Sequence, residues 1–248
     1  DSRKIPQEPM SGEYETPVKK RWDSITMEEK ISLLKKECTR LKIDDRIVDW
    51  EAHLWNTDVE TCLIGSNGGV LHQRFHILVP DLRSTANNGT ETINRTFGGF
   101  RLGRQGGLEI LDDLEFYTSA PRVSSQAIEL LDAPNCPTGN MDLLLAPDQM
   151  VLQIHESIGH PLELDRILGD ERNYAGTSFV TQDMFGSYQY GSDLLNVTFD
   201  PTIEEEMASY GFDDDGAPAK KEYIIRKGIL ERPLGGTVSQ TRADMPGV

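Results

Sequence analysis

Cysteines, long apolar runs and basic residues are all scarce in this 248-residue chain, and each shortage excludes a class of protein. The three cysteines, Cys38, Cys62 and Cys136, are too few and too widely spaced for a disulfide framework or a CxxC metal knuckle. A reducing compartment, the cytoplasm, is therefore the simplest location. No apolar run approaches the length needed to cross a bilayer, so we expect no membrane as a partner.

The shortage of basic residues also limits the partners of the chain. Lys and Arg together number 25 against 41 Asp and Glu, which gives a formal net charge of -16. A polyanion repels DNA and anionic membranes, so nucleic acid is not expected as a partner. Hydrophobic residues at 37% and charged residues at 27% are typical of a globular protein with one large or two small domains.

The two ends of the sequence suggest a piece of a longer protein. The first residue is Asp1 rather than methionine, and the closing stretch GGTVSQTRADMPGV is turn-like, resembling neither a helix nor a strand. Residues 1–22 are polar and contain proline, which predicts an irregular arm.

An α+β fold is expected, with an N-terminal α/β domain over residues 23–146. Thr26 and Glu29 form a capping box, in which each side chain satisfies the other's free backbone N–H, so a helix begins here. Apolar residues at helical spacing then predict one stripe, formed by Met27, Ile31, Leu34, Cys38 and Leu41.

Three strands should follow this helix. Residues 48–54 alternate between apolar and polar, and residues 59–65 and 70–79 are two more strand-like runs. Between the last two, Asn67-Gly68 tolerates positive φ and suits a tight hairpin turn.

The rest of this domain is predicted from composition. The glycine-rich stretch 98–107 lacks the Lys-Ser/Thr pair of a phosphate loop, and a flexible surface loop is expected instead. Residues 108–118 and 121–132 resemble helices, and the apolar run MDLLLAP, 141–147, predicts a buried strand.

Three histidines fall on the predicted strands. His53 lies on the first, whereas His72 and His76 lie an even number of residues apart and share a face of another. The simpler interpretation is that these histidines lie on the polar faces of their strands. The alternative is that they bind a metal.

The chemistry of the sequence centres on HESIGH, residues 155–160, on a helix that can begin at Pro147. A histidine offers a metal ligand, and the neighbouring Glu156 offers a base for a water that the metal activates. His155 and His160, however, are five residues apart, so a regular helix would rotate them by about 140° from one another.

A widened, π-type turn would bring the two histidines to one ion. Gly159 makes such a distortion sterically easier, and Pro161 disfavours α geometry at His160. The alternatives are a chance HExxxH match and a His160 that only caps the C-terminal end of the helix.

The surroundings of the motif resemble the TldD/PmbA family of metallopeptidases. The stretch HESIGHPLELDRILGDERNYAGTSFV is similar to the family's HExxxH, acidic run and Gly-Thr-Ser strand, and DDDGAPAKKEYIIRKGIL to its later Asp-Gly and IxxGIL stretch. RVSSQAIELLDAPNCPTGNMDLLLAP is similar to the segment before the motif. The resemblance covers about 120–248 well and 24–110 only in the order of elements. Pro161 departs from the family's usual glycine.

The resemblance implies a role for each matching residue. His155 and His160 would bind Zn²⁺, and Glu156 would be the general base. The family's third ligand is a cysteine of a C-terminal β-rich domain, placed beyond Val248, with Glu163 or Asp165 as weaker local candidates. Residues 147–248 would then hold the motif helix and the incomplete beginning of that domain, including a strand over 176–185 and a hairpin around Lys227-Gly228.

The function implied is a zinc-dependent peptidase subunit that hydrolyses peptides or unfolded protein segments. The resemblance also implies a dimer, either of one subunit or with a related subunit that lacks HExxxH. Two alternatives stay open: a non-catalytic partner or scaffold subunit of such an assembly, and an acidic binding domain without metal.

Overall fold

The computed structural model describes residues 10–66 and 68–248 and shows a mixed α+β fold, which confirms the predicted fold class. Its N-terminal part contains β1 (Gly12–Glu15), α1 (Met27–Leu41), β2 (Ile47–Ile64), β3 (Val70–Asn87), β4 (Thr92–Gly98), β5 (Arg104–Gln105), α2 (Ile110–Asp113) and α3 (Phe116–Leu131). The C-terminal part contains α4 (Pro147–Ile154), α5 (Leu164–Leu168), β6 (Val197–Phe199), β7 (Glu222–Arg226), β8 (Ile229–Leu230) and α6 (Thr237–Ala243). Among the residues described, no helix has the length and apolar character to cross a membrane.

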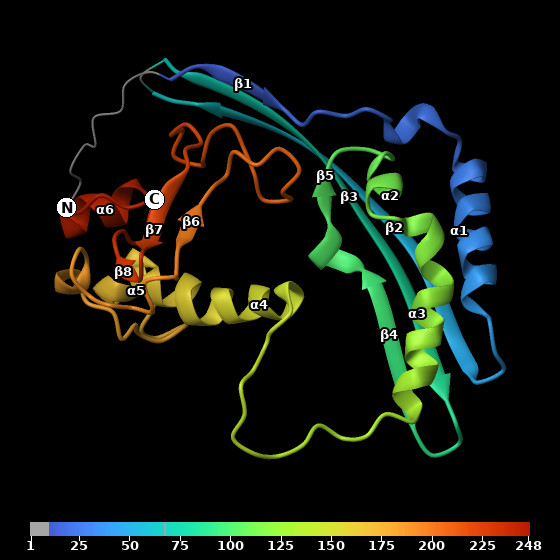
Figure 1. Cartoon of the computed structure of the whole chain (residues 1–248). Helices are drawn as coiled ribbons and strands as arrows, with labels where there is room; N and C mark the ends of the chain where they lie inside the picture. Colours follow the sequence, from blue (N-terminus) through green and yellow to red (C-terminus); the bar gives the residue numbers. More distant parts are fainter. Residues whose placement is uncertain (1–9, 67) are drawn as a thin grey trace.

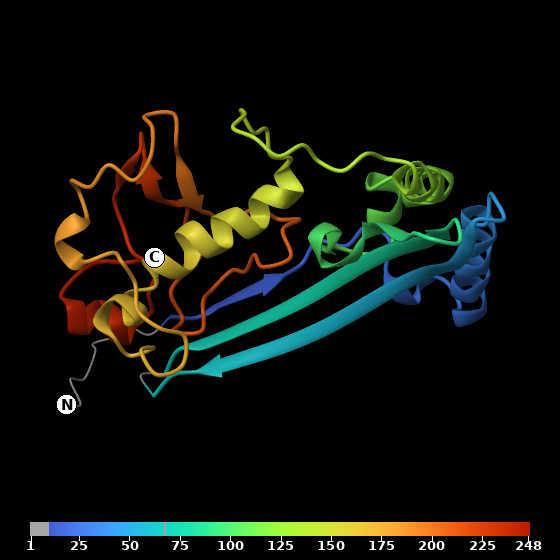
Figure 2. The ribbon, with the colours of Figure 1, turned by 90° about the horizontal axis from the view of Figure 1, so that it is seen from below.

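The long hairpin of β2 and β3 forms the centre of the N-terminal sheet (Figure 1). The two strands pair antiparallel from Ile64↔Val70 to Ile47↔Ala86, and Figure 2 shows them running together across most of the molecule. The two strands predicted between 48 and 65 are therefore one, because backbone pairing with β3 carries β2 through its polar middle. Gly68 has a φ of 91° in the connecting turn, as a tight turn requires, whereas Asn67 lies outside the described residues.

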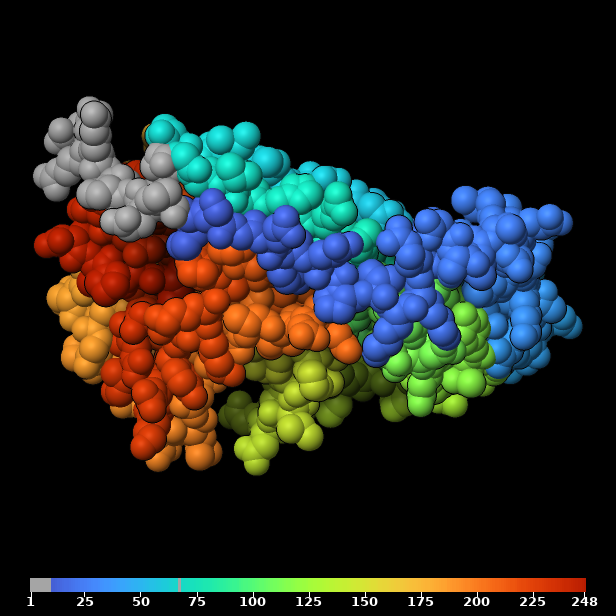
Figure 3. Space-filling view, turned by 90° about the horizontal axis from the view of Figure 1, so that it is seen from above, coloured from blue at the N-terminus to red at the C-terminus, as the bar shows by residue number. Residues whose placement is uncertain are grey.

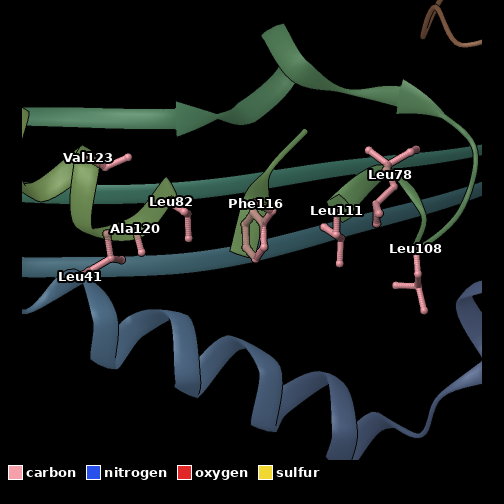
Figure 4. Packing of buried hydrophobic residues seen from close by; sticks show 9 residues of the cluster. Leu41, Leu78, Leu82, Leu108, Leu111, Phe116, Ala120 and Val123 are labelled. Atoms are coloured by element: carbon pink, nitrogen blue, oxygen red, sulfur yellow. The ribbon is translucent and has the colours of Figure 1, made fainter. Parts of the chain in front are cut away.

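The first core lies between this sheet and the helices α1, α2 and α3 (Figure 4). Phe116, Leu111 and Leu82 are fully buried there. The Ser124 hydroxyl on α3 donates a hydrogen bond of 2.6 Å to the Leu41 carbonyl and accepts one of 2.9 Å from the Ser84 hydroxyl, which ties α1, α3 and β3 together. Replacing water around these side chains with close-packed neighbours is the main stabilising contribution here.

The capping box of α1 is confirmed, but the predicted apolar stripe is partly wrong. Met27 and Ile31 are 61% and 45% exposed, whereas Lys30 and Glu37 are buried. The Lys30 amine donates to the Ile25 carbonyl at 2.7 Å and lies 4.4 Å from the centre of the Trp22 ring, and Glu37 pairs with Arg40. Specific partners for charged groups thus decide which face of α1 is buried.

Two other N-terminal predictions need correction. Within the arm 1–22, whose first nine residues lie outside the described part, Gly12–Glu15 forms β1 parallel to β3. The stretch 98–107 is no flexible surface loop, because it includes β5 and is buried around Gln105. At Gly107 a Cβ atom would lie 2.1 Å from the Lys20 carbonyl oxygen, so close backbone packing explains glycine here.

Two buried glutamines join the C-terminal part to the sheet. Gln73 on β3 accepts hydrogen bonds from the backbone N–H groups of Gly211 and Phe212 and donates to the Phe212 carbonyl, all within 3.0 Å. Gln105 donates to the Ser209 carbonyl at 2.5 Å and accepts from the Tyr14 hydroxyl at 2.8 Å. Figure 3 shows the orange segment of the C-terminal part lying against the blue N-terminal segment.

The C-terminal part has its own small sheet, in the order β6-β7-β8, and its own core. The predicted hairpin is confirmed, with positive φ at Lys227 and Gly228. The strand predicted over 176–185 is absent, and α6 forms in the closing stretch expected to be turn-like.

The buried strand predicted over 141–147 is also wrong. Residues 141–146 are irregular, and Leu143 and Leu144 are 76% and 98% exposed. A strand needs a hydrogen-bonding neighbour as well as an apolar sequence, and the described part of the chain pairs none with this segment.

Asp81 on β3 makes the stability of the fold depend on pH. Its Oδ1 atom is buried and has no hydrogen-bond partner among the described residues, and burial raises the pKa of Asp81 above its ordinary 3.8. The folded state therefore holds this proton more tightly than the unfolded chain. The free energy of unfolding thus falls as the pH rises from 3.8 through the raised pKa of the folded state.

We expect Asp81→Asn, which cannot ionise, to raise the melting temperature at pH 7 by roughly 1–3 °C. The gain should vanish below about pH 4, where Asp81 is protonated in both states. Thermal unfolding followed by circular dichroism at both pH values measures this, with the exposed Asp49→Asn as control. An equal gain at both pH values would show that the carboxylate charge is not the cause.

Candidate metal centre

The motif helix α4 begins at Pro147, as predicted. Proline occupies the first turn, where its missing N–H is not needed, and Asp148 places a carboxylate near the positive end of the helix dipole. None of the residues of α4 is buried, so the helix presents most of its surface to solvent.

A π-helical turn continues the helix over His155–Gly159, so the predicted widened turn is confirmed. The backbone N–H of His160 donates to the carbonyl of His155, which is the i to i+5 bond that defines this geometry. Five residues thus make one turn, and the two histidines lie one above the other instead of about 140° apart.

The turn brings three potential metal ligands together. The imidazole rings of His155 and His160 have centroids 4.3 Å apart and an interplanar angle of 74°. One ligand atom each of His155, Glu156 and His160 lies within 4.8 Å of the other two. Two imidazoles that can reach one ion, with a carboxylate beside them, suit Zn²⁺, so the residues present fit a metal ion.

Neighbouring elements hold the wide turn in place. The Tyr190 hydroxyl donates to the carbonyl of Ser157, and Ile158 is buried in the C-terminal core with Leu162 and Val180. The buried side of the turn is therefore anchored, whereas His155 and Glu156 on the other side are exposed.

The reasons expected for the widening are different from those observed. Gly159 has an ordinary φ of -54°, and a Cβ atom there would meet only the Ile154 carbonyl oxygen, at 3.8 Å. His160 keeps α geometry, with φ -58° and ψ -42°, although Pro161 follows it. Neither residue forces the distortion, and the contacts of Ser157 and Ile158 account for it better.

Glu163 supports His160 instead of joining the three clustered ligands. Its Oε1 atom lies 2.8 Å from Nδ1 of His160, and Nε of Arg166 donates to Oε2, also at 2.8 Å. When Nδ1 carries the proton of this contact, Nε2 of His160 keeps its lone pair for a metal, which is the usual carboxylate–histidine arrangement. Asp165 accepts a bond from the Arg166 N–H and also lies outside the three-residue group.

The environment keeps Glu163 ionised. Partial burial raises its pKa, but the contacts with His160 and Arg166 outweigh this effect, and the pKa of Glu163 is lowered overall. Arg166 and Tyr190 were missed by sequence reasoning. Arg166 follows Glu163 at i+3 and was detectable as a helical charge pair, whereas no local signal pointed to Tyr190.

The strand histidines form no metal site with the motif. His53, His72 and His76 each contact a carboxylate, of Glu51, Glu60 and Asp58 respectively, at 2.6 to 2.8 Å. These are polar pairs on the sheet surface, and within the described residues only the HESIGH group clusters three possible ligands. Cys136 is exposed in the linker before α4 and lies outside this group.

The part of the chain that contains this turn is similar to known proteins. Residues 138–247 match the model of the PmbA/TldA metallopeptidase C-terminal domain. A metalloprotease from Methanocaldococcus jannaschii is 33% identical over 154 residues, 62% of this chain and 32% of that protein. Over residues 138–247 the chain is similar to the PmbA/TldD metallopeptidase family. A metalloprotease TldD homologue from Haemophilus influenzae is 28% identical over 212 residues, 84% of this chain and 42% of that protein.

Solved structures share the fold. A proposed modulator of DNA gyrase from Bacteroides thetaiotaomicron aligns with a TM-score of 0.74 at 14% identity, over 94% of this chain and 50% of that chain. TldE from Thermococcus kodakarensis aligns with a TM-score of 0.64 at 14% identity, over 99% of this chain and 53% of that chain. The chain spans about a third to two fifths of the length of the two curated relatives named above.

The contact between Glu163 and His160 can be tested through metal affinity. We expect Glu163→Gln, which keeps the shape but removes the charge, to weaken Zn²⁺ binding about 10–100-fold, the usual effect of losing such a support. Asp165→Asn should leave the affinity unchanged. Calorimetric titration with Zn²⁺ measures both, and a complete loss of binding in Glu163→Gln would instead make Glu163 a direct ligand.

Proposed function

We propose that this chain is a zinc-dependent peptidase subunit that hydrolyses peptides or unfolded protein segments. The observation that carries the proposal is the convergence of His155, Glu156 and His160 on one exposed side of the π turn. The similarity of residues 138–247 to a metallopeptidase domain supports it, and the solvent-facing α4 leaves the site open to an extended substrate.

His155 and His160 would hold the ion, with Glu163 and Arg166 fixing the orientation of His160. A bound Zn²⁺ supplies Lewis acidity and lowers the pKa of water to near neutrality. Glu156 follows His155 directly and is exposed, so its carboxylate can take the proton from the attacking water and pass it to the leaving amine. Histidine ligands and a separate carboxylate base thus share one turn of helix.

The other parts of the assembly are proposals from family resemblance. They are a third ligand, a cysteine outside this chain, and a dimer with an identical or related subunit. The cytoplasm is the proposed compartment, and Cys38, Cys62 and Cys136 are all free thiols, as a reducing environment favours.

A non-catalytic scaffold subunit is the competing function. A scaffold subunit has no need of a catalytic base beside the two histidines, whereas Glu156 lies in the same group as His155 and His160. An acidic binding domain without metal would likewise not explain the stacking of two imidazoles by a widened turn.

Glu156→Gln tests the proposed base. The amide keeps the size of the side chain but takes no proton at neutral pH. We therefore expect bound zinc to remain, while peptide hydrolysis by the protein that includes the proposed third ligand falls at least 10²-fold. Elemental analysis and a fluorogenic peptide assay measure the two quantities. Glu129→Gln, on an exposed position of α3, is the matched control, and turnover at the wild-type rate in Glu156→Gln would remove Glu156 from the mechanism.

A further inference from the structure

A cavity of about 510 Å³ lies between the sheet, α3 and the motif helix. It is bounded by β4 and the turn that follows it, by α3, by the first residues of α4, and by Glu206 of the C-terminal part. The walls include the side chains of Phe97, Val123 and Val151, so the cavity has apolar surfaces as well as charged ones.

Four arginines line this cavity, in a chain whose net charge is -16. Arg101 is neutralised by Asp148 at 3.1 Å. The other three guanidinium groups contact neutral partners: Arg95 donates to the Gln126 side chain, Arg104 to the Gly103 carbonyl and Arg122 to the Ser119 hydroxyl.

Three of the arginines therefore carry positive charge that no ion pair neutralises within the described residues. Within the described part of the chain, no carboxylate forms an ion pair with Arg95, Arg104 or Arg122. Glu206 and Asp148 are the acidic residues of the lining, so four positive charges face two negative ones. Concentrated positive charge on an acidic protein is suited to attract a negative ligand.

The cavity and the candidate metal centre lie at different points along one face of the helix. Asp148 and Val151 line the cavity, and His155 follows Val151 by four residues, which places it on the same face one turn later. One turn advances about 6 Å, which an extended peptide covers in about two residues.

We propose that this cavity binds an Asp or Glu side chain of the peptide substrate, two or three residues from the bond that is cut. Guanidinium groups recognise carboxylates through charge-assisted hydrogen bonds, and the apolar walls can hold the methylene groups of the same side chain. This inference rests on the proposed peptidase function and adds a preference for acidic segments to it.

Peptide binding in the absence of metal tests the cavity directly. Two fluorescent, unstructured peptides that differ only by one Glu in place of Gln are titrated into the EDTA-treated protein, with fluorescence anisotropy as the readout. We expect the Glu peptide to bind about fivefold more tightly at low salt, and the preference to shrink at high salt. Equal affinities for the two peptides would overturn the proposal.

Variants assign the preference to the arginines. Arg104→Gln with Arg122→Gln should reduce the affinity ratio of the two peptides to about one. Arg104→Lys with Arg122→Lys keeps the charge and should retain part of the preference, which separates loss of charge from loss of folding. Arg74→Gln, an exposed arginine paired with Glu60 elsewhere on the sheet, is the matched control. A Glu preference that survives in the double Gln variant would contradict the assignment.

A position scan distinguishes this inference from the proposed function. Glu is moved one residue at a time along a neutral peptide, and the cleavage products of the zinc-loaded protein are identified by mass spectrometry. We expect cleavage to follow the Glu at a constant offset of two or three residues. Cleavage that ignores the Glu would reject the acidic preference while keeping the peptidase. Absence of any cleavage by the protein that includes the proposed third ligand, with the metal-free Glu preference intact, would reject the peptidase while keeping the binding site.

Discussion

The hydrogen bond from the His160 N–H to the His155 carbonyl determines what this molecule can do. With regular α-helical bonding, the same sequence would place its two motif histidines on different sides of the helix, and no single ion could reach both. One extra residue in one turn moves the rings to a centroid distance of 4.3 Å. The exposed part of the site is thus a consequence of backbone geometry, and that geometry depends on contacts on the buried side.

Those contacts come from the C-terminal core. Ile158, a residue of the turn, packs into this core, and the Tyr190 hydroxyl donates to the carbonyl of Ser157. Leu162 and Leu164, which follow the turn, are fully buried. Leu234 also holds the segment that follows the turn. Its N–H donates to the Leu162 carbonyl at 2.8 Å, and its carbonyl accepts from the Leu164 N–H at 2.7 Å. A strained or irregular element persists where its surroundings determine it from several directions, and this turn meets that condition.

Local signals in the sequence predicted the local features well. The capping box at Thr26, proline at the start of α4, the wide turn and the hairpin at Lys227 each depend on residues that are neighbours in the chain. The ligand group was predictable for the same reason, because five-residue spacing and two imidazoles allow few geometries. Glu163 was named only as a weaker candidate ligand, and the structure pairs it with Nδ1 of His160. Spacing alone cannot distinguish a ligand from a partner of the ligand.

Features that depend on distant residues were not predictable. The run MDLLLAP has the composition of a buried strand, but its exposed Leu144 shows that composition does not supply a neighbouring strand. In α1 the apolar pattern suggested burial of Met27, whereas the packing of Lys30 over Trp22 selects another face. Burial of a charged residue depends on a partner, and no periodicity reveals that partner.

The two halves of the molecule contribute different groups of residues to the candidate site and the cavity. The histidines and Glu156 stand on a turn supported by the C-terminal core, whereas the arginines of the cavity stand mainly on β4, α3 and the turn between β4 and β5. The distance between the histidines and the arginines therefore depends on the contacts between the two halves. These contacts include the hydrogen bonds of the buried Gln73 and Gln105 and the ion pair of Arg101 with Asp148. A cavity formed in this way can change its charge without disturbing the ligands, because none of its arginines contacts His155 or His160. In the proposed function, selection of the substrate and chemistry on it are then physically separable tasks of one helix face.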